Sequence, residues 1–143
     1  MTYVLDTHPI VWFLEGSGRL SAQAGIILRD PSHRLILPTI VLVEITYLYS
    51  KGQIAVDIAV VQQRLVAAVN CVLYPLDEQV ALRIPTGLNI HDAIIVATAL
   101  VYRDILHKPV AVITKNGEIT RAGFINTIEL IVRFQCNYAK IKE

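Results

Sequence analysis

The chain lacks several features that mark whole classes of protein. Its 143 residues include only two cysteines, Cys71 and Cys136, which form no metal-like pair, so we expect reduced thiols. It contains no glycine-rich phosphate loop. It also lacks a charge bias, because 13 basic residues oppose 12 acidic ones for a net charge of +1. Bulk charge therefore does not indicate nucleic-acid binding, and any basic patch must be local.

Long apolar runs are missing too, although 54% of the residues are hydrophobic and the mean hydropathy is +0.51. The longest apolar stretch, residues 35–49, is interrupted by Pro38, Thr39, Glu44 and Thr46, and a spanning helix needs about 20 mostly apolar residues. The N-terminus resembles no signal peptide. We expect no membrane contact and a cytoplasmic location. The apolar excess then belongs to a parallel sheet buried on both faces, or to an oligomer interface.

Strand-like and helix-like segments alternate along the chain. Ser21, Thr39 and Asp57 stand where side chains commonly cap helix N-termini. This alternation predicts βαβ units, and hence a three-layer α/β/α fold with a central, mostly parallel sheet and a single domain over residues 1–143. The predicted strands are residues 3–6, 35–37, 72–74 and 110–114, and the predicted helices are residues 9–16, 21–29, 40–50, 57–69, 77–83 and 91–105.

Three acidic residues stand out against their surroundings. Asp6 directly follows an apolar strand, where it serves either as a helix cap or as a site residue. Glu44 lies in a helix that is apolar almost all round, with no basic residue within one turn. A buried carboxylate is costly alone, so Glu44 indicates either a structural ion pair or a functional site. Asp92 opens an apolar helix, where capping is the plain alternative and the helix dipole favours a carboxylate.

Together these carboxylates favour a metal site. Ligands bind beyond the carboxyl ends of the strands in parallel α/β sheets, which is where Asp6 and Asn116 are expected. Like charges that are brought together raise one another's pKa unless a cation neutralises them. Ligands that are all oxygen suit Mg²⁺ or Mn²⁺, and such an ion suits phosphodiester hydrolysis by a metal-bound water.

Four segments carry a family resemblance. Residues 5–14 (LDTHPIVWFL), 38–45 (PTIVLVEI), 90–100 (IHDAIIVATAL) and 112–116 (VITKN) resemble, in order, the four motifs of PIN-domain proteins, particularly the VapC-like toxins of toxin–antitoxin pairs. The resemblance implies an endoribonuclease that depends on Mg²⁺ or Mn²⁺ and acts on RNA. It also implies a homodimer and a small protein antitoxin as partner.

Carried over residue by residue, the resemblance makes Asp6, Glu44 and Asp92 the catalytic acids, with Asp6 and Asp92 as metal ligands. Thr7 and Thr114 would hydrogen-bond the carboxylates or a substrate phosphate, or else simply cap strand ends. The chain departs from the fullest family pattern at Asn116, where many members carry Asp. An amide oxygen still holds a metal-bound water but brings no charge.

Glu118, two residues after Asn116, is the candidate that would supply the negative charge that Asn116 lacks. Lys115 and Arg121 are candidates for RNA phosphate contacts, or are surface charges. Trp12 and Phe13 are expected in the core or in a dimer interface rather than as base-stacking residues.

Other interpretations remain open. The chain could be a non-catalytic PIN-like module that binds RNA or a protein, since the fourth acidic position is an amide. An unrelated Mg²⁺-dependent phosphohydrolase is the third possibility, and the missing phosphate loop counts against it. His8 and His91 neighbour the acids and are expected to form structural hydrogen bonds. Most of the stripe formed by Tyr47, Leu48 and Tyr49 is expected in the core, with a groove for a partner helix as the alternative.

Overall fold

The structure, a computed structural model, describes residues 1–129. Cys136 lies outside the described residues, and Cys71 is a free, half-buried cysteine. The described elements are, in chain order, β1 (Thr2–Leu5), α1 (Thr7–Glu15), α2 (Ala22–Arg29), β2 (Arg34–Pro38), α3 (Thr39–Ser50), α4 (Ile58–Ala67), β3 (Cys71–Tyr74), α5 (Glu78–Ala81), α6 (Ile90–Asp104), β4 (Val110–Thr114), α7 (Gly117–Ala122) and β5 (Asn126–Glu129).

The five strands form one sheet in the order β3-β2-β1-β4-β5, and every neighbouring pair is parallel. The chain moves outward from β1 through β2 to β3, then returns to place β4 on the other side of β1. This reversal is the topological switch point, where parallel α/β sheets open a crevice beyond the carboxyl ends of their strands. The predicted three-layer α/β/α fold with a mostly parallel sheet is confirmed.

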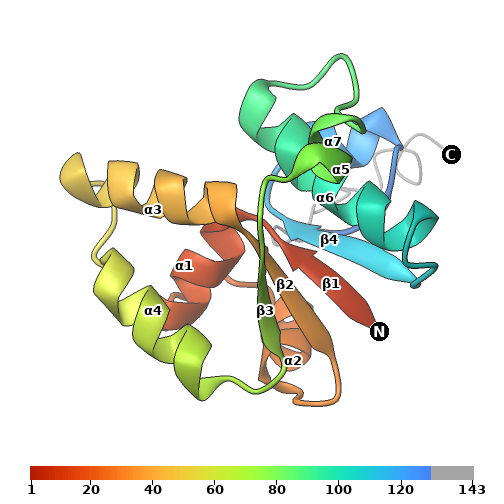
Figure 1. Ribbon diagram of the computed structural model, residues 1–143. Coiled ribbons are helices and arrows are strands. Elements are labelled where there is room, and N and C mark those ends of the chain that lie inside the picture. The colour runs from red at the N-terminus through yellow and green to blue at the C-terminus, as the bar shows by residue number, and fades with distance from the viewer. Residues whose placement is uncertain (130–143) are drawn as a thin grey trace, which may run out of the picture.

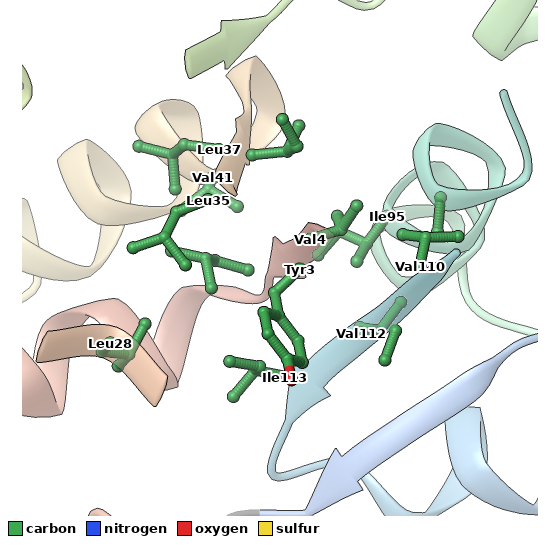
Figure 2. Packing of buried hydrophobic residues seen from close by; sticks show 14 of the residues in the cluster. Tyr3, Val4, Leu28, Leu35, Leu37, Val41, Ile95, Val110, Val112 and Ile113 are labelled. Atoms are coloured by element: carbon green, nitrogen blue, oxygen red, sulfur yellow. The ribbon is translucent and has the colours of Figure 1, made fainter. Parts of the chain in front are cut away.

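Helices cover both faces of the sheet. In Figure 1, α1, α3 and α4 lie on one side of the strands, and α5 and α6 lie on the other. The core lies along the middle strand, β1, and its neighbour β4, because every residue of these two strands is buried. Figure 2 shows the labelled side chains of these strands packed beside Leu35 and Leu37 of β2 and Ile95 of α6. The expected double-sided burial of the sheet therefore accounts for much of the chain's apolar excess.

Helix α6 is enclosed more completely than a surface helix, because every residue from Asp92 to Tyr102 is buried. One side contacts β1 and β4, while α5 covers Ile94, Ala97 and Val101 through Val80. Despite this apolar character, no helix in residues 1–129 is long and apolar enough to cross a membrane.

The helix starts follow the sequence with one exception. Ser21 Oγ accepts a hydrogen bond from Ala24 N at 3.1 Å, and Asp57 Oδ1 accepts one from Val60 N at 3.0 Å, so both predicted caps are confirmed. The prediction for Thr39 is wrong. Helix α3 starts directly from strand β2, with Pro38 as a cap that has no side-chain bond, and Thr39 Oγ1 instead accepts from Leu76 N at 3.1 Å.

Helix α3 is also less buried than its apolar sequence predicts. Only Val41 and Ile45 are buried, because a single stripe of the helix faces its neighbours. Tyr47 and Tyr49 are 60% and 48% exposed, so placing them in the core was wrong. Trp12, at 8% exposure, is buried as expected.

Candidate active site

A cleft opens beyond the carboxyl ends of β1 and β4, at the switch point of the sheet. Strand β1 ends immediately before Asp6, and β4 ends two residues before Asn116. Helix α3 brings Glu44 to this cleft, and the first turn of α6 brings Asp92. The three predicted acids therefore meet at one place, although 86 residues separate the first from the last in the chain. The cleft is lined by Asp6, His8, Glu44, Asn89, His91, Asp92, Lys115, Asn116 and Gly117.

Asp6 is almost fully buried, with 6% exposure. Its Oδ1 accepts a hydrogen bond from Thr7 N at 2.7 Å as the cap of α1, and its Oδ2 accepts one from Thr114 Oγ1 at 2.7 Å. Burial raises the pKa of Asp6, and the charge of Glu44 adds to the effect, while the bonds from Thr114 and Thr7 oppose it. The cap of α1 uses only Oδ1, so capping leaves Oδ2 for its bond with Thr114.

Glu44 has both carboxylate oxygens engaged. Oε2 accepts from Thr7 Oγ1 at 2.7 Å, and Oε1 lies 3.0 Å from His91 Nδ1. The Glu44 side chain is 18% exposed and Thr7 is fully buried. Helix α3 has no basic partner of its own for Glu44, and the close contact with His91 comes from α6 instead.

Asp92 lies in the first turn of α6 and is 7% exposed. Its Oδ2 accepts from Asn89 Nδ2 at 2.6 Å and from Asn116 Nδ2 at 2.5 Å. Burial raises the pKa of Asp92, with further contributions from the charges of Asp6 and Glu118. The cap of α6 is Asn89, whose Oδ1 accepts from Asp92 N, so Asp92 itself is free to face the cleft.

Asn89 is a site residue that the sequence interpretation missed. It falls between the predicted helices 77–83 and 91–105, yet it caps α6 and also binds the Asp92 carboxylate. The available signal was its place three residues before Asp92, where a capping side chain reaches the third helical amide.

The fourth segment brings an amide to the cleft rather than a charge. Asn116 caps the short helix α7 by accepting from Glu118 N at 2.8 Å, and its Nδ2 donates to Asp92. Glu118 is exposed and does not line the cleft, although its charge reaches Asp92. Of the two candidates for the fourth position, Asn116 is the one that contacts a site carboxylate.

Two cations lie close enough to His8, a residue of the cleft lining, to act on its charge. Lys115 lines the cleft, and together with Arg19 it opposes protonation of His8. Burial of His8 and these two charges lower its pKa to about 4. His8 is therefore neutral near pH 7, and the local positive charge resides on Lys115 and Arg19. Arg121, the other cation considered for RNA contact, does not line the cleft.

The donors present suit a hard divalent cation held partly by water. Each oxygen of Asp6 accepts one hydrogen bond, whereas a carboxylate offers about four lone-pair sites. A cation would also offset the burial and repulsion that raise the pKa values of Asp6 and Asp92. No group of three His, Cys, Asp or Glu side chains within residues 1–129 is arranged to hold a metal. Oxygen donors of this kind suit a hard divalent cation that keeps several of its own waters.

Thr114 offers a test of how the site is held. Its buried hydroxyl donates to Asp6 and accepts from Asn116 N at 2.9 Å, so Thr114→Val removes a partner from the buried Asp6 carboxylate and from the half-buried Asn116 N. We expect a loss of about 1–3 kcal/mol in the free energy of unfolding, measured by urea denaturation. Thr98→Val is the matched control, because the buried Thr98 hydroxyl bonds only Ile94 O within α6. An equal loss in the two variants would contradict a special role for Thr114.

Comparisons with known proteins agree with this architecture. A family model described as the PIN domain matches residues 3–125. The fold is similar to a chain in the crystal structure of VapBC2 from Rickettsia felis bound to a DNA fragment from their promoter. The TM-score is 0.64 and the sequence identity is 15%, and the match covers 92% of this chain and 100% of that chain. The fold is also similar to a chain in the structure of VapBC-1 from nontypeable Haemophilus influenzae, with a TM-score of 0.61, 21% identity, and coverage of 91% and 98%. A search of curated proteins found no match.

Proposed function

The chain belongs to the PIN domain family, and from this premise we propose that it is a metal-dependent endoribonuclease that hydrolyses RNA phosphodiester bonds. The observation that carries the proposal is the meeting of Asp6, Glu44 and Asp92 in one cleft at the switch point of the sheet. Three carboxylates, one directly after β1, one on α3 and one on α6, repel one another, so folding alone does not favour their convergence. We assign them as the catalytic acids.

In this proposal Asp6 and Asp92 hold Mg²⁺ or Mn²⁺. The bound ion supplies an activated water and stabilises the charge that develops on the phosphate. Thr114 and Asn89 orient the two carboxylates through the hydrogen bonds described above. Thr7 and His91 contact the Glu44 carboxylate at the cleft, and in this proposal that carboxylate would accept a proton from the attacking water.

We further propose that the protein is the toxin of a toxin–antitoxin pair, acting in the cytoplasm as a single-domain homodimer with a protein antitoxin. The support is the similarity of fold to chains of two VapBC structures, one of them bound to promoter DNA. Expression in a bacterial host tests the toxin assignment. Wild type should arrest growth and Asp6→Asn should not; growth arrest by both would contradict it.

The alternative is a non-catalytic PIN-like module that binds RNA or a protein. Asn116 favours it, because an amide occupies the fourth position and one of its hydrogen bonds engages Asp92 Oδ2. A cleavage assay separates the two functions. Linear RNA incubated with the protein and Mg²⁺ or Mn²⁺ should be shortened by a nuclease, whereas a binding module should retard it in a gel without shortening it.

Asn116→Asp should tighten metal binding if this position belongs to the metal site. One added charge near a divalent ion is worth several kcal/mol before desolvation and screening are subtracted, so we expect roughly one to two orders of magnitude in metal affinity. Wild type should then need millimolar Mg²⁺, and the variant much less, for half-maximal cleavage.

Glu118→Gln is the matched comparison. If Glu118 already supplies the fourth charge, Glu118→Gln should weaken metal binding and Asn116→Asp should change little. Metal titrations of both variants distinguish the accounts. No effect from either would place this segment outside the metal site.

A further inference from the structure

Two cations lie over the ring of Trp12, near the acidic cleft. The Arg19 guanidinium carbon is 6.0 Å from the centroid of this ring, and Lys115 Nζ is 5.8 Å from it. The His8 ring stands edge-on to the same indole, with centroids 5.6 Å apart. These residues come from α1, from the turn after α1 and from the end of β4, so the fold assembles the cluster from segments about 100 residues apart.

Both cations have their charge available. Arg19 and Lys115 are exposed, and neither forms an ion pair with a carboxylate anywhere in the described part of the chain. The indole face attracts each cation and holds its position, which reduces the entropy that an ordered contact would otherwise cost. Lys115 and His8 also line the acidic cleft, so the cluster adjoins the candidate catalytic carboxylates.

We propose that Arg19 and Lys115, positioned by Trp12, form a subsite that holds a phosphate group of the RNA strand next to the acidic cleft. The inference rests on the proposed ribonuclease function. A cleft with three carboxylates repels a polyanion, so a strand bound there needs cations beside the acids. A guanidinium and an ammonium are the groups that bind phosphate oxygens, the first often through two parallel hydrogen bonds.

The burial of Trp12 decides which part of the strand the subsite contacts. Trp12 as a residue is only 8% exposed, and a base that stacks needs an open aromatic face. Arg19 and Lys115, by contrast, are both exposed residues. The subsite therefore contacts the backbone rather than a base, and it should bind strands of different sequence alike.

Binding of a 12-nucleotide oligouridylate in EDTA tests the subsite. Fluorescein anisotropy measures affinity at several salt concentrations, and a gel confirms that the strand stays intact. Arg19→Gln and Lys115→Gln should each weaken binding about fivefold at about 0.1 M salt and lower the salt slope by about 0.7, since each removes one phosphate contact to a single strand. The double variant should lose about 25-fold.

Lys51→Gln is the matched control. Lys51 Nζ also lies over an aromatic ring, 5.5 Å from that of Tyr47, but beyond the end of α3 and outside the cleft lining. It should bind the oligonucleotide like wild type. Trp12 is the only tryptophan of the chain, so its emission should change as unlabelled oligouridylate is added and should saturate with the same affinity.

Several results would overturn the subsite: no binding by wild type, unchanged affinity and salt slope in the double variant, or an equal loss in Lys51→Gln. The ribonuclease proposal fails separately. Binding that depends on Arg19 and Lys115 without cleavage in Mg²⁺ supports the subsite and contradicts the nuclease. Cleavage in Mg²⁺ by a double variant that binds like wild type supports the nuclease and contradicts the subsite.

Discussion

Asp6→Asn should reduce RNA cleavage by about 10²–10⁴-fold, the range typical for loss of a group that acts directly in catalysis. The substitution keeps the size of the side chain and its capping oxygen, but it removes the charge that would bind the metal. Asp92→Asn and Glu44→Gln should have comparable effects. The measurement is the initial rate of cleavage of a labelled RNA at saturating Mg²⁺. Asp30→Asn, at an exposed turn remote from the cleft, is the control and should cleave like wild type.

The loss of cleavage in Asp6→Asn should not come from unfolding. Folding raises the pKa of Asp6 above its ordinary value of 3.8, so above that pH the folded state binds more protons than the unfolded one. The contribution of Asp6 to stability is therefore present below pH 3.8 and is lost as the pH rises through its folded pKa. Near neutral pH, metal-free Asp6→Asn should be as stable as wild type or more so. Marked destabilisation would make its lost activity uninformative and would contradict the assigned electrostatics.

Metal removal should abolish cleavage as completely as the three substitutions do. In EDTA the carboxylates of Asp6 and Asp92 face each other's charge without a cation, and a nucleophilic water is not activated. Excess Mg²⁺ or Mn²⁺ should restore the rate. A metal that binds only the folded state should also raise the free energy of unfolding, by about 2.7 kcal/mol at a hundredfold excess over its Kd.

The stabilisation by metal should be lost in Asp6→Asn and in Asp92→Asn, because each variant lacks a metal ligand. Thermal unfolding with and without Mn²⁺ measures it. An equal rise in melting temperature for wild type and both variants would place the ion elsewhere, and an undiminished cleavage rate in EDTA would contradict metal dependence altogether.

The central sheet was predictable because its strands are short apolar runs with clear ends. Strand β4 is five buried, largely β-branched residues, and Asp6 marks the end of β1 as an acid after an apolar run. The rule that ligands bind beyond the carboxyl ends of parallel strands then brought Asp6 and Asn116 together from opposite ends of the chain.

The elements after β4 were not predicted. Helix α7 has only six residues, too few for a helical period to stand out, and β5 (Asn126–Glu129) is a polar edge strand. Pairing with β4 stabilises β5 as a strand, although the sequence of β5 does not predict one. The exposure of Tyr47 and Tyr49 was missed for a related reason, since an apolar helix does not show how many of its faces have neighbours.

The arrangement within the site depends on contacts between distant segments. The order of the chain does not show that Thr114 bonds Asp6 or that His91 meets Glu44. The position of Arg19 and Lys115 around Trp12 is likewise a product of the fold. Sequence patterns thus pointed to Asp6, Glu44 and Asp92. The residues that contact these acids could be found only from the folded structure.

Cleavage of a circular single-stranded RNA tests the central claim most directly, because a circle has no end for an exonuclease to attack. In Mg²⁺ or Mn²⁺, wild type should convert the circle to a linear strand and then to fragments. The circle should stay intact in EDTA, and it should stay intact with Asp6→Asn prepared in the same way. A circle that wild type leaves intact across a full titration of both metals, or one that Asp6→Asn opens as fast as wild type does, would contradict the assignment of this cleft as the active site of a metal-dependent endoribonuclease.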